Sequence, residues 1–483
     1  MKFSRYSLFF PSVLVIFLVF SFFSCTKDEP STDSSYQLTF SNDSVVFDTV
    51  FTTIGSVTQE LRIYNKNNKK IKISYLRLAG GEQSAYRLNI DGQNTWIKND
   101  VELDKDDSLF IFVRVRINPN DKNSPFLVSD SIEFLTNGNY QNIKLIAYGQ
   151  NAYYHTPDHF PADLPPYSII ECSQTWTSDK PHLIYGWAIV DSASTLVMEG
   201  GTRVYFHHGA GLLVKKEASL KVNGEAENKV IFRNDRLDQF YKDLPGQWEG
   251  IYFADGSPES YIHYAEILNG TTGLMIEQRN NNRRARFEIT ETLIRNMKKG
   301  GLRSTGCNLY SVNCVIVNCG SYALQLEGGI HEFIHLSIGN FWTSGIRMSP
   351  SLLLTNYYMD GENQINIEPT SFNFTNSIIF GNQYEEISID QGEQGTGFPY
   401  IFDHCLLKTS LNTTDESIFP SCLINIDPLF VDIEKPKLEP DSLSPVLHAG
   451  KSAGVLQDIL GRQRDMQRPA LGAYEPDYSG GKR

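Results

Sequence analysis

The chain has 483 residues, 41 % of them hydrophobic, and a formal net charge of -13 at neutral pH. This hydrophobic content excludes a largely disordered chain, and the length predicts two or three domains. Sequence-independent binding to nucleic acid needs Lys and Arg to neutralise phosphates, so the acidic balance argues against a nucleic-acid partner. A polyanionic ligand would need a local basic patch.

The first 24 residues have the layout of a secretory signal peptide. Lys2 and Arg5 precede an apolar run from Leu8 to Phe23. This run is shorter than the roughly 20 residues that a membrane-spanning helix needs. We therefore expect a signal peptide over residues 1–24, and cleavage of the chain before Cys25.

The stretch that ends at Cys25 resembles the signal of a bacterial lipoprotein. Ser24 fits the small residue of the lipobox, whereas Phe22 and Phe23 depart from its usual leucine and small residue, a looseness tolerated in Bacteroidetes. Residues 27–29, a lysine followed by two acidic residues, resemble the surface-export signal of that group. The resemblance implies an acylated Cys25 and an outer-membrane lipoprotein that is exposed on the cell surface, since several acyl chains anchor firmly. The alternative is an ordinary cysteine near an ordinary cleavage site.

Six further cysteines are spread along the chain, and none has the spacing of a zinc site. A metal–thiolate site is therefore not expected. We also predict no cofactor and no metal-ligating residues, and calcium binding stays open. Most of these cysteines are expected to be small buried hydrophobes. They are Cys172, Cys307, Cys314, Cys319, Cys405 and Cys422.

Residues 25–35 are rich in Ser, Thr, Asp and Pro and predict a lipidated tether. Over 36–150, short runs such as "DSLFIFVRVRIN" alternate apolar and polar residues between Asn-, Gly- and Asp-containing breaks, which predicts a small antiparallel β-sandwich. This segment resembles the Ig-like modules at the start of Bacteroidetes surface proteins. The Pro- and aromatic-rich stretch 151–182 is expected to be an ordered linker.

Beyond this linker the chain repeats itself with a period of 22 residues. A repeat this short cannot bury its own core and must stack on its neighbours. We interpret the repeated asparagine as the bend of each coil, with its amide bonded to the neighbouring coils. The evenly spaced sets are Asn296, Asn318 and Asn340, then Ile294, Ile316 and Ile338, then Leu302, Leu324 and Ile346.

Residues 183–478 resemble a right-handed parallel β-helix of the pectate-lyase type in its Bacteroidetes lipoprotein form, followed by a tail over 479–483. The specific marks are "GQWEGIYF", the 22-residue coils and the ending "DILGRQRDMQRPALGAYE". That ending resembles a terminal cap coil. The resemblance implies an all-β chain in which a right-handed parallel β-helix is preceded by a small Ig-like β-sandwich.

The second strand of each coil is expected to point alternate residues inward and outward. The expected inward residues are Leu274, Ile276, Leu302, Ser304, Leu324, Leu326, Ile346, Met348, Ile387 and Ile389. The expected outward columns are Met275, Arg303, Gln325, Arg347 and Ser388, and beside them Glu277, Thr305, Glu327, Ser349 and Asp390.

Arg303, Gln325 and Arg347 are the candidate binding residues of this outward face. Two arginines that are two coils apart stand roughly 9.6 Å from each other, which suits successive carboxylates or hydroxyls of a sugar chain. The alternative is an ordinary solvated sheet face.

Glu277, Glu327 and Asp390 are the candidate catalytic acids, because β-helix hydrolases need paired carboxyl groups. The clustered Asp pairs, Gly-His-Gly and Arg-x-Lys strings of pectin hydrolases are absent, and no calcium cluster of a lyase is legible.

Asp followed by Ser or Thr and an aliphatic residue resembles the O-glycosylation acceptor motif of Bacteroidetes. A turn before a strand explains the same pattern equally well. The candidate acceptors are Ser44, Thr49, Ser108, Ser131, Ser192 and Ser442.

Three functions stay open at this point. The leading hypothesis is a surface protein that is bound to the membrane through its N-terminal lipid and whose β-helix binds a polysaccharide without cleaving it. The rivals are a lyase or glycoside hydrolase of acidic polysaccharide, and a structural or adhesive surface protein. The step from fold to glycan is an analogy, because one fold hosts many functions.

Overall fold

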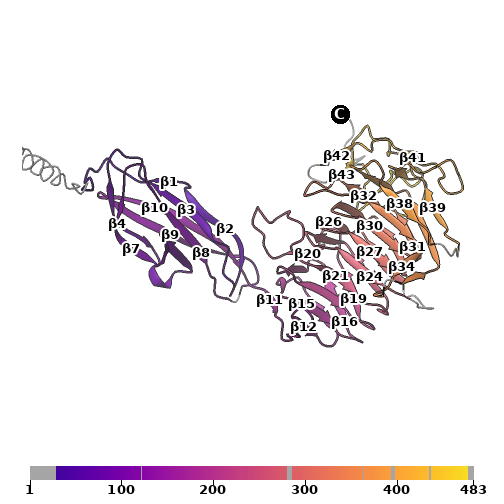
Figure 1. Ribbon diagram of the computed structural model, residues 1–483, viewed down its shortest axis with the longest axis horizontal. Helices are drawn as coiled ribbons and strands as arrows, with labels where there is room; N and C mark the ends of the chain where they lie inside the picture. Colours follow the sequence, from indigo (N-terminus) through magenta and orange to yellow (C-terminus); the bar gives the residue numbers. More distant parts are fainter. Residues whose placement is uncertain are drawn as a thin grey trace, which may run out of the picture. The chain divides into compact units, whose positions relative to one another are not determined.

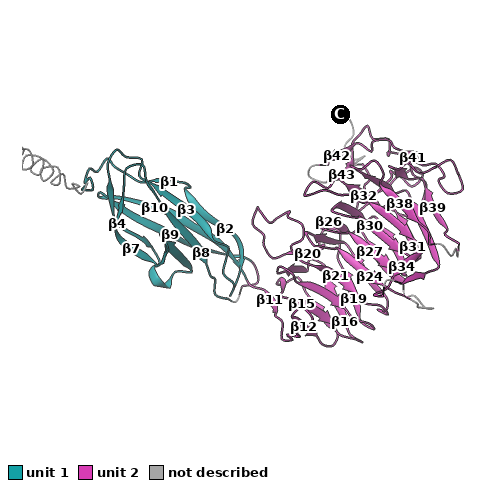
Figure 2. Ribbon diagram, viewed as in Figure 1, with its two compact units in different colours: residues 1–120, 125–150 teal, residues 121–124, 151–483 magenta. Residues whose placement is uncertain are grey.

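The computed structural model describes residues 29–120, 122–279, 286–362, 364–392, 397–433 and 437–476. The chain divides into two compact units, one that ends at Gln150 and one that comprises residues 121–124 and 151–483 (Figure 2). Cys25 and the predicted signal peptide lie outside the described residues. Over the described ranges, no helix has the length and apolar character needed to cross a membrane.

The first unit is a sandwich of two five-stranded sheets (Figure 1). One sheet has the order β1 (Thr39–Phe40), β3 (Gln59–Tyr64), β8 (Ser108–Val115), β5 (Tyr86–Ile90) and β6 (Gln93–Asn94). The other has the order β2 (Ser44–Phe51), β10 (Asn139–Gln150), β9 (Phe126–Thr136), β4 (Ile71–Leu78) and β7 (Ile97–Leu103). The pairings are antiparallel except that β2 runs parallel to β10. In β8 the residues Leu109, Ile111, Val113 and Val115 are buried and the intervening ones face outward, as the alternation predicts.

The second unit contains three parallel sheets in which most strands pair with the third strand along the chain, the arrangement of a parallel β-helix (Figure 1). Sheet 1 contains β11 (Tyr153–His155), β14 (His182–Ile184), β17 (Arg203–Phe206), β20 (Val230–Asn234), β23 (Ala265–Leu268), β26 (Leu293–Met297), β29 (Val315–Cys319), β32 (Ser337–Asn340), β37 (Ile378–Gly381), β40 (Leu406–Leu407) and β41 (Leu423–Ile424).

Sheet 2 contains β12 (Tyr167–Ile170), β15 (Trp187–Val190), β18 (Gly211–Val214), β21 (Gly250–Phe253), β24 (Leu274–Glu277), β27 (Leu302–Thr305), β30 (Leu324–Glu327), β33 (Leu352–Thr355) and β38 (Ile387–Asp390). Sheet 3 contains β13 (Gln174–Trp176), β16 (Thr195–Glu199), β19 (Ser219–Asn223), β22 (Ser260–His263), β25 (Arg286–Thr290), β28 (Asn308–Val312), β31 (Gly329–Ile334), β36 (Thr370–Thr375) and β39 (Tyr400–Asp403). The stretch 151–182, expected as a linker, supplies the first strand of each sheet. Two hairpins, β34 (Tyr357–Met359) with β35 (Ile365–Ile367) and β42 (Phe430–Asp432) with β43 (Lys437–Pro440), stand outside the three sheets.

From β22 onward, one residue with a positive φ lies just before each strand of sheet 1 that is entered from sheet 3, and Ser421 holds the same place before β41. L-residues adopt the left-handed conformation as single residues and do not continue it as a helix, so each of these residues makes one sharp bend in the chain. The residues at this bend are Tyr264, Glu291, Asn313, His335, Asn376, His404 and Ser421, with φ between 47° and 57°.

The predicted 22-residue register holds in sheet 1, where Ile294, Ile316 and Ile338 are direct neighbours. In sheet 2 it holds from Leu302 to Leu324 and then fails, because Leu324 pairs with Leu352, 28 residues later. The six extra residues form a longer connection after β32. Leu352 and Leu354 therefore take the inward positions that were predicted for Ile346 and Met348. The side chains of Ile346 and Met348 are 91 % and 90 % exposed.

The asparagine ladder includes the predicted Asn296 but continues to the preceding coils, through Asn269 and Asn234, and not to Asn318 and Asn340. Asn269 donates to the side-chain oxygen of Asn234 at 2.9 Å, and Asn296 donates to that of Asn269 at 3.4 Å. Asn318 keeps a positive φ of 54°, but its side-chain oxygen has no hydrogen-bond partner among the described residues. Asn340 instead accepts a hydrogen bond from the backbone N–H of Cys319.

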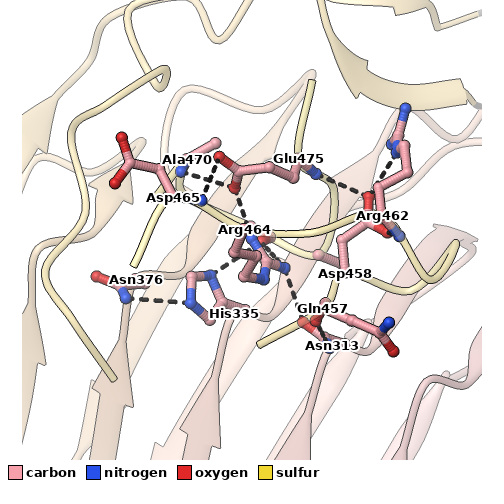
Figure 3. A network of polar contacts seen from close by, with 12 residues as sticks. Asn313, His335, Asn376, Gln457, Asp458, Arg462, Arg464, Asp465, Ala470 and Glu475 are labelled. Atoms are coloured by element: carbon pink, nitrogen blue, oxygen red, sulfur yellow. Dashed lines mark hydrogen bonds and ion pairs between the residues drawn. The ribbon is translucent and has the colours of Figure 1, made fainter. Parts of the chain in front are cut away.

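The C-terminal segment, predicted as a terminal cap, runs back along the outside of sheet 1. Leu438, Ile459 and Ala473 pack on the outward side chains of Val315 and Val317. Figure 3 shows the polar contacts that fix this segment, in which the fully buried Arg464 binds Glu475 at 3.1 Å and the Asn313 side chain at 2.7 Å. His335, itself a bend residue, donates to the Gly472 carbonyl at 3.1 Å. The segment thus covers apolar strand residues that would otherwise face water.

Candidate functional site

Three of the predicted site residues on sheet 2 lie together and bind one another. Gln325 is the direct neighbour of Arg303. The Arg303 guanidinium donates to both oxygens of Glu327, with a shortest contact of 2.8 Å, and Gln325 donates to the same carboxylate at 2.7 Å. Thr305 adds a further hydrogen bond at 2.8 Å. Glu327 is 8 % exposed and its oxygens are occupied by these donors, so it is poorly placed to protonate or attack a substrate.

The other two candidate acids also have partners. Glu277 accepts a hydrogen bond from Arg279 at 2.8 Å. Asp390 accepts one from the Tyr357 hydroxyl at 2.6 Å, and this interaction raises the pKa of Tyr357 to about 12. The strand register puts one coil between Glu277 and Glu327, with Thr305 as the neighbour of both. The three acids are thus placed on one sheet face, but each is committed to a neighbouring donor.

The assignment of Arg347 to this outward column is wrong. The register puts Leu353, not Arg347, beside Gln325. Arg347 lies in the longer connection after β32, where its side chain is 1 % exposed and forms an ion pair of 2.7 Å with the fully buried Glu386. It also donates to Asn382 at 2.7 Å and to the Asn340 carbonyl at 3.1 Å. Arg347 therefore anchors a connection in the fold and cannot contact a ligand on the sheet.

The candidate O-glycosylation acceptors occupy two kinds of environment. Ser192 and Ser442 are exposed, whereas Ser44, Thr49, Ser108 and Ser131 are half-buried. The backbone N–H groups of Thr49, Ser108 and Ser131 each donate to the preceding aspartate at 2.7 Å. These contacts give the Asp-Ser pattern a local structural role, and modification stays a prediction.

A hollow of about 1060 Å³ lies on the outer face of the sandwich, on the sheet that contains β3, β8 and β5. Its apolar lining includes the side chains of Trp96 and Phe112, which are 40 % and 38 % exposed. The polar lining residues are Thr58, Glu82, Arg87, Asn89, Asn94, Thr95, Arg114 and Arg116. Exposed aromatic rings beside polar groups are the features that a binding site for a small or linear ligand requires.

The arginines of this hollow have no carboxylate partner among the described residues. Arg87 and Arg114 are direct cross-strand neighbours, a like-charge pair that destabilises a sheet. Arg114 donates to the Thr58 hydroxyl at 2.6 Å, and Arg87 donates to the carbonyls of Ser84 and Tyr86. Their contacts are thus with neutral oxygens, and the positive charge stays available to an anion.

The sequence contains a signal for this hollow that is not among the predicted site residues. In the run "FIFVRVR" the outward positions are Phe110, Phe112, Arg114 and Arg116, alternating with buried Ile111, Val113 and Val115. The Arg62 guanidinium lies 4.1 Å from the centre of the Phe110 ring on the same face. Two aromatic residues followed by two arginines on one strand face form a recognisable amphipathic pattern.

A second cluster that the sequence did not indicate involves two histidines of the first coils. His155 Nε2 and His182 Nδ1 lie 3.0 Å apart, and both rings stack on Trp176. Burial lowers the pKa of His155 to about 4 and that of His182 to about 3. Within the described residues, no group of three or more His, Cys, Asp or Glu side chains is arranged to hold a metal ion.

No protein-family model matches the chain, and no curated protein matches it. Among solved structures, the PapD-like domain 7 of human CEP192 is 11 % identical over 26 % of this chain and 91 % of that domain, with a TM-score of 0.17. A family 123 glycoside hydrolase from Clostridium perfringens is 9 % identical over 23 % of this chain and 26 % of its own, with a TM-score of 0.16. The alkylpurine DNA glycosylase AlkC of Pseudomonas fluorescens is 8 % identical over 23 % of this chain and 30 % of its own, with a TM-score of 0.15. Likenesses at these TM-scores carry no argument about this chain.

Proposed function

We propose that this protein is a lipid-anchored cell-surface protein that binds an acidic polysaccharide without cleaving it, and that the sandwich hollow is its binding site. The observation that carries the proposal is the pairing of exposed Trp96 and Phe112 with Arg87 and Arg114, which have no carboxylate partner among the described residues. Guanidinium groups fork onto planar carboxylate and sulfate groups. Aromatic faces offer apolar area to the flat side of a sugar ring at little entropic cost.

The absence of cleavage rests on the acids of the β-helix. Glu277, Glu327 and Asp390 each accept a hydrogen bond from a neighbouring side chain, and Glu327, the acid between the other two, has donors on both oxygens, which argues against a pair of catalytic acids. We propose further that the β-helix is right-handed, as about 98 % of parallel β crossovers are, and that the sandwich is an Ig-like module.

The test uses the full-length protein in a gel-shift assay with polygalacturonate, a sulfated glucan and neutral starch. The parent protein should bind the two acidic polymers. The double variant Arg87→Ala with Arg114→Ala should weaken this binding at least tenfold. The matched control is Arg303→Ala, which removes an outward arginine that Glu327 already neutralises and should leave retention unchanged. Shortening of the polymer, or equal retention of neutral starch, would refute the proposal.

The anchor is tested separately. Cys25→Ala should abolish labelling by a radioactive fatty acid and release the protein from membranes, because the acyl chains would have no attachment point. Alanine substitutions at 27–29 should keep the label but make the protein resistant to protease added to whole cells. Persistent labelling of the Cys25 variant would show that this residue is not the anchor.

An adhesive role is the second candidate, and one observation favours it. Ile346 and Met348 are 91 % and 90 % exposed on either side of Arg347, whose ion pair with Glu386 fixes the connection. Large apolar side chains held outward on a fixed loop are typical of contact with another macromolecule. Capture of another surface protein that depends on Ile346 and Met348 but not on Arg114 would support this role.

A further inference from the structure

Cys405 and Cys422 occupy equivalent positions in the last two coils of the β-helix. Each cysteine directly precedes a short strand of sheet 1, and these strands pair in register, Leu406 with Leu423. The backbone N–H of Leu423 donates to the Cys405 carbonyl at 2.8 Å. Each cysteine also follows a bend residue of positive φ, His404 at 51° and Ser421 at 54°. The two Cα–Cβ bonds therefore leave the backbone in the same way from neighbouring strands.

This spacing is compatible with a disulfide. Neighbouring strands are about 4.8 Å apart, and the Cα atoms of a disulfide are usually about 4.4–6.8 Å apart. By contrast, the register neighbour of Cys319 on the preceding coil is Met297. The register thus places one pair of thiols, those of Cys405 and Cys422, at equivalent positions before neighbouring strands.

The two thiols differ in a way that suits stepwise oxidation. Cys405 is fully buried, and burial raises its pKa well above the ordinary value. Cys422 is only partly buried, and a hydrogen bond with the Cys405 side chain lowers its pKa. The thiolate is the attacking species in thiol–disulfide exchange. Cys422 is therefore the thiol that meets an external oxidant, and Cys405 is the thiol that completes the bond.

We propose that Cys405 and Cys422 form an intrachain disulfide that closes the last coil of the β-helix. The Cys422 thiolate attacks one sulfur of an external disulfide, which forms a mixed disulfide and releases one thiol of the oxidant. Cys405 then loses its proton and attacks the Cys422 sulfur, which releases the second thiol. The chain loses two electrons and two protons, and the external disulfide is reduced to two thiols.

The position of this bond gives it a structural purpose. Sheet 2 ends at β38 and sheet 3 at β39, whereas sheet 1 continues to β41, which is its edge strand. An edge strand that pairs on one side only separates more readily from its sheet. A covalent bond from Cys422 to Cys405 would hold this last strand on the stack. The inference does not depend on the proposed polysaccharide binding.

The experiment uses the full-length protein with oxidised glutathione as the probe, at about pH 8 where thiolates are populated. Remaining thiols are blocked with iodoacetamide in denaturant, and trypsin then cuts at Lys408, which lies between the two cysteines. Mass spectrometry should find the two cysteine peptides joined, and reduction should separate them. The reduced protein should melt a few degrees lower, since the disulfide constrains the unfolded chain.

Two variants sharpen the result. With Cys405→Ser, Cys422 should accumulate as a mixed disulfide with glutathione, because no second thiol can release it. With Cys319→Ala, a buried cysteine is removed elsewhere and the cross-link should persist. The proposal is overturned if both peptides of the parent protein carry iodoacetamide after treatment, or if Cys422 of the parent stays bound to glutathione. The parent result decides the matter even if a variant fails to fold.

Discussion

Arg114 on the sandwich and Arg303 on the β-helix both point outward from the middle of a sheet, yet their surroundings differ. The cross-strand neighbour of Arg114 is another arginine, Arg87, and neither forms an ion pair with a described carboxylate. Arg303 stands beside Gln325, and both bind the carboxylate of Glu327. At these two positions the β-helix neutralises its outward arginine internally, whereas the sandwich, which pairs other basic side chains such as Arg77 with Glu133, leaves Arg87 and Arg114, beside aromatic rings, without an ion-pair partner among the described residues.

This difference follows from how each unit is built. In a parallel β-helix the same position recurs on successive coils, so a charged residue always has neighbours about 4.8 Å above and below it. A carboxylate one coil away can then satisfy an arginine at the cost of ordering only one side chain. The sandwich sheet is antiparallel and brings distant strands together, and its opposed arginines persist at a cost in stability. Such a cost is expected where a ligand supplies the missing charge.

The comparison predicts that removing charge from the β-helix costs stability, most of all at Arg347. Arg347→Ala should lower the free energy of unfolding by about 3–5 kcal/mol, because it leaves the fully buried Glu386 without its ion pair. Urea unfolding followed by tryptophan fluorescence measures the effect. The double variant Arg347→Met with Glu386→Leu should recover much of the loss, since no buried charge remains. A loss below about 1 kcal/mol in the single variant would mean that Arg347 is solvated.

The paired histidines His155 and His182 predict that the stability of the β-helix depends on pH. The folded state lowers the pKa of His155 from 6.5 to about 4, so the folded protein disfavours the charged ring. Stability is therefore complete above pH 6.5 and falls as the pH drops from 6.5 to about 4, because the unfolded chain binds the proton first. The loss for His155 should be on the order of 3 kcal/mol.

Thermal melts between neutral and mildly acidic pH check this prediction. His155→Phe should flatten the curve in that window, whereas His208→Gln, at an exposed position, should leave its shape unchanged. A melting temperature of the parent that is constant over the window would contradict the burial of the pair.

The asparagine bends provide an intermediate effect. Asn269 and Asn318 both have positive φ values, 66° and 54°, so glycine can replace either one without backbone strain. Asn269→Gly should cost about 1–3 kcal/mol, because the Asn234 side-chain oxygen and the Lys242 carbonyl lose their donor. Asn318→Gly should cost less than about 1 kcal/mol, because its own side-chain oxygen is unpaired. Equal losses of unfolding free energy in the two variants, measured by urea unfolding, would indicate that Asn318 is bonded to its neighbours as the sequence predicted.

Much of the fold was readable from the sequence for a physical reason. Alternation in β8 and the spacing of Ile294, Ile316 and Ile338 are local and periodic signals, and the burial of one strand face enforces them. The register beyond Leu324 was not readable, because an insertion in a connection leaves the repeat intact and only shifts it. The 22-residue register, continued through that insertion, therefore predicted Arg347 on the outward sheet face, whereas its side chain is buried.

The candidate site was less predictable than the fold. The closeness of Arg303, Gln325 and Glu327 followed from the repeat, but their mutual binding depends on side-chain geometry that spacing does not determine. The hollow combines residues from strands that are distant in sequence, among them Arg87 and Arg114, and only the antiparallel pairing of β5 with β8 brings them together. The fold resemblance concerned the β-helix, so the predicted binding and catalytic residues all belong to that unit.

The smallest expected effect is on the stability of the sandwich itself. Arg114→Gln removes one of two opposed positive charges and keeps a polar group that can reach Thr58. The free energy of unfolding should stay unchanged or rise by up to about 0.5 kcal/mol, because like charges across a sheet are destabilising. The gain should vanish in about 1 M salt, where the screening length is about 3 Å. Retention of acidic polysaccharide should nevertheless fall, which separates a residue kept for a ligand from one kept for the fold. A loss of more than about 1 kcal/mol in the free energy of unfolding would show that Arg114, like Arg347, stabilises the fold, and would contradict the comparison.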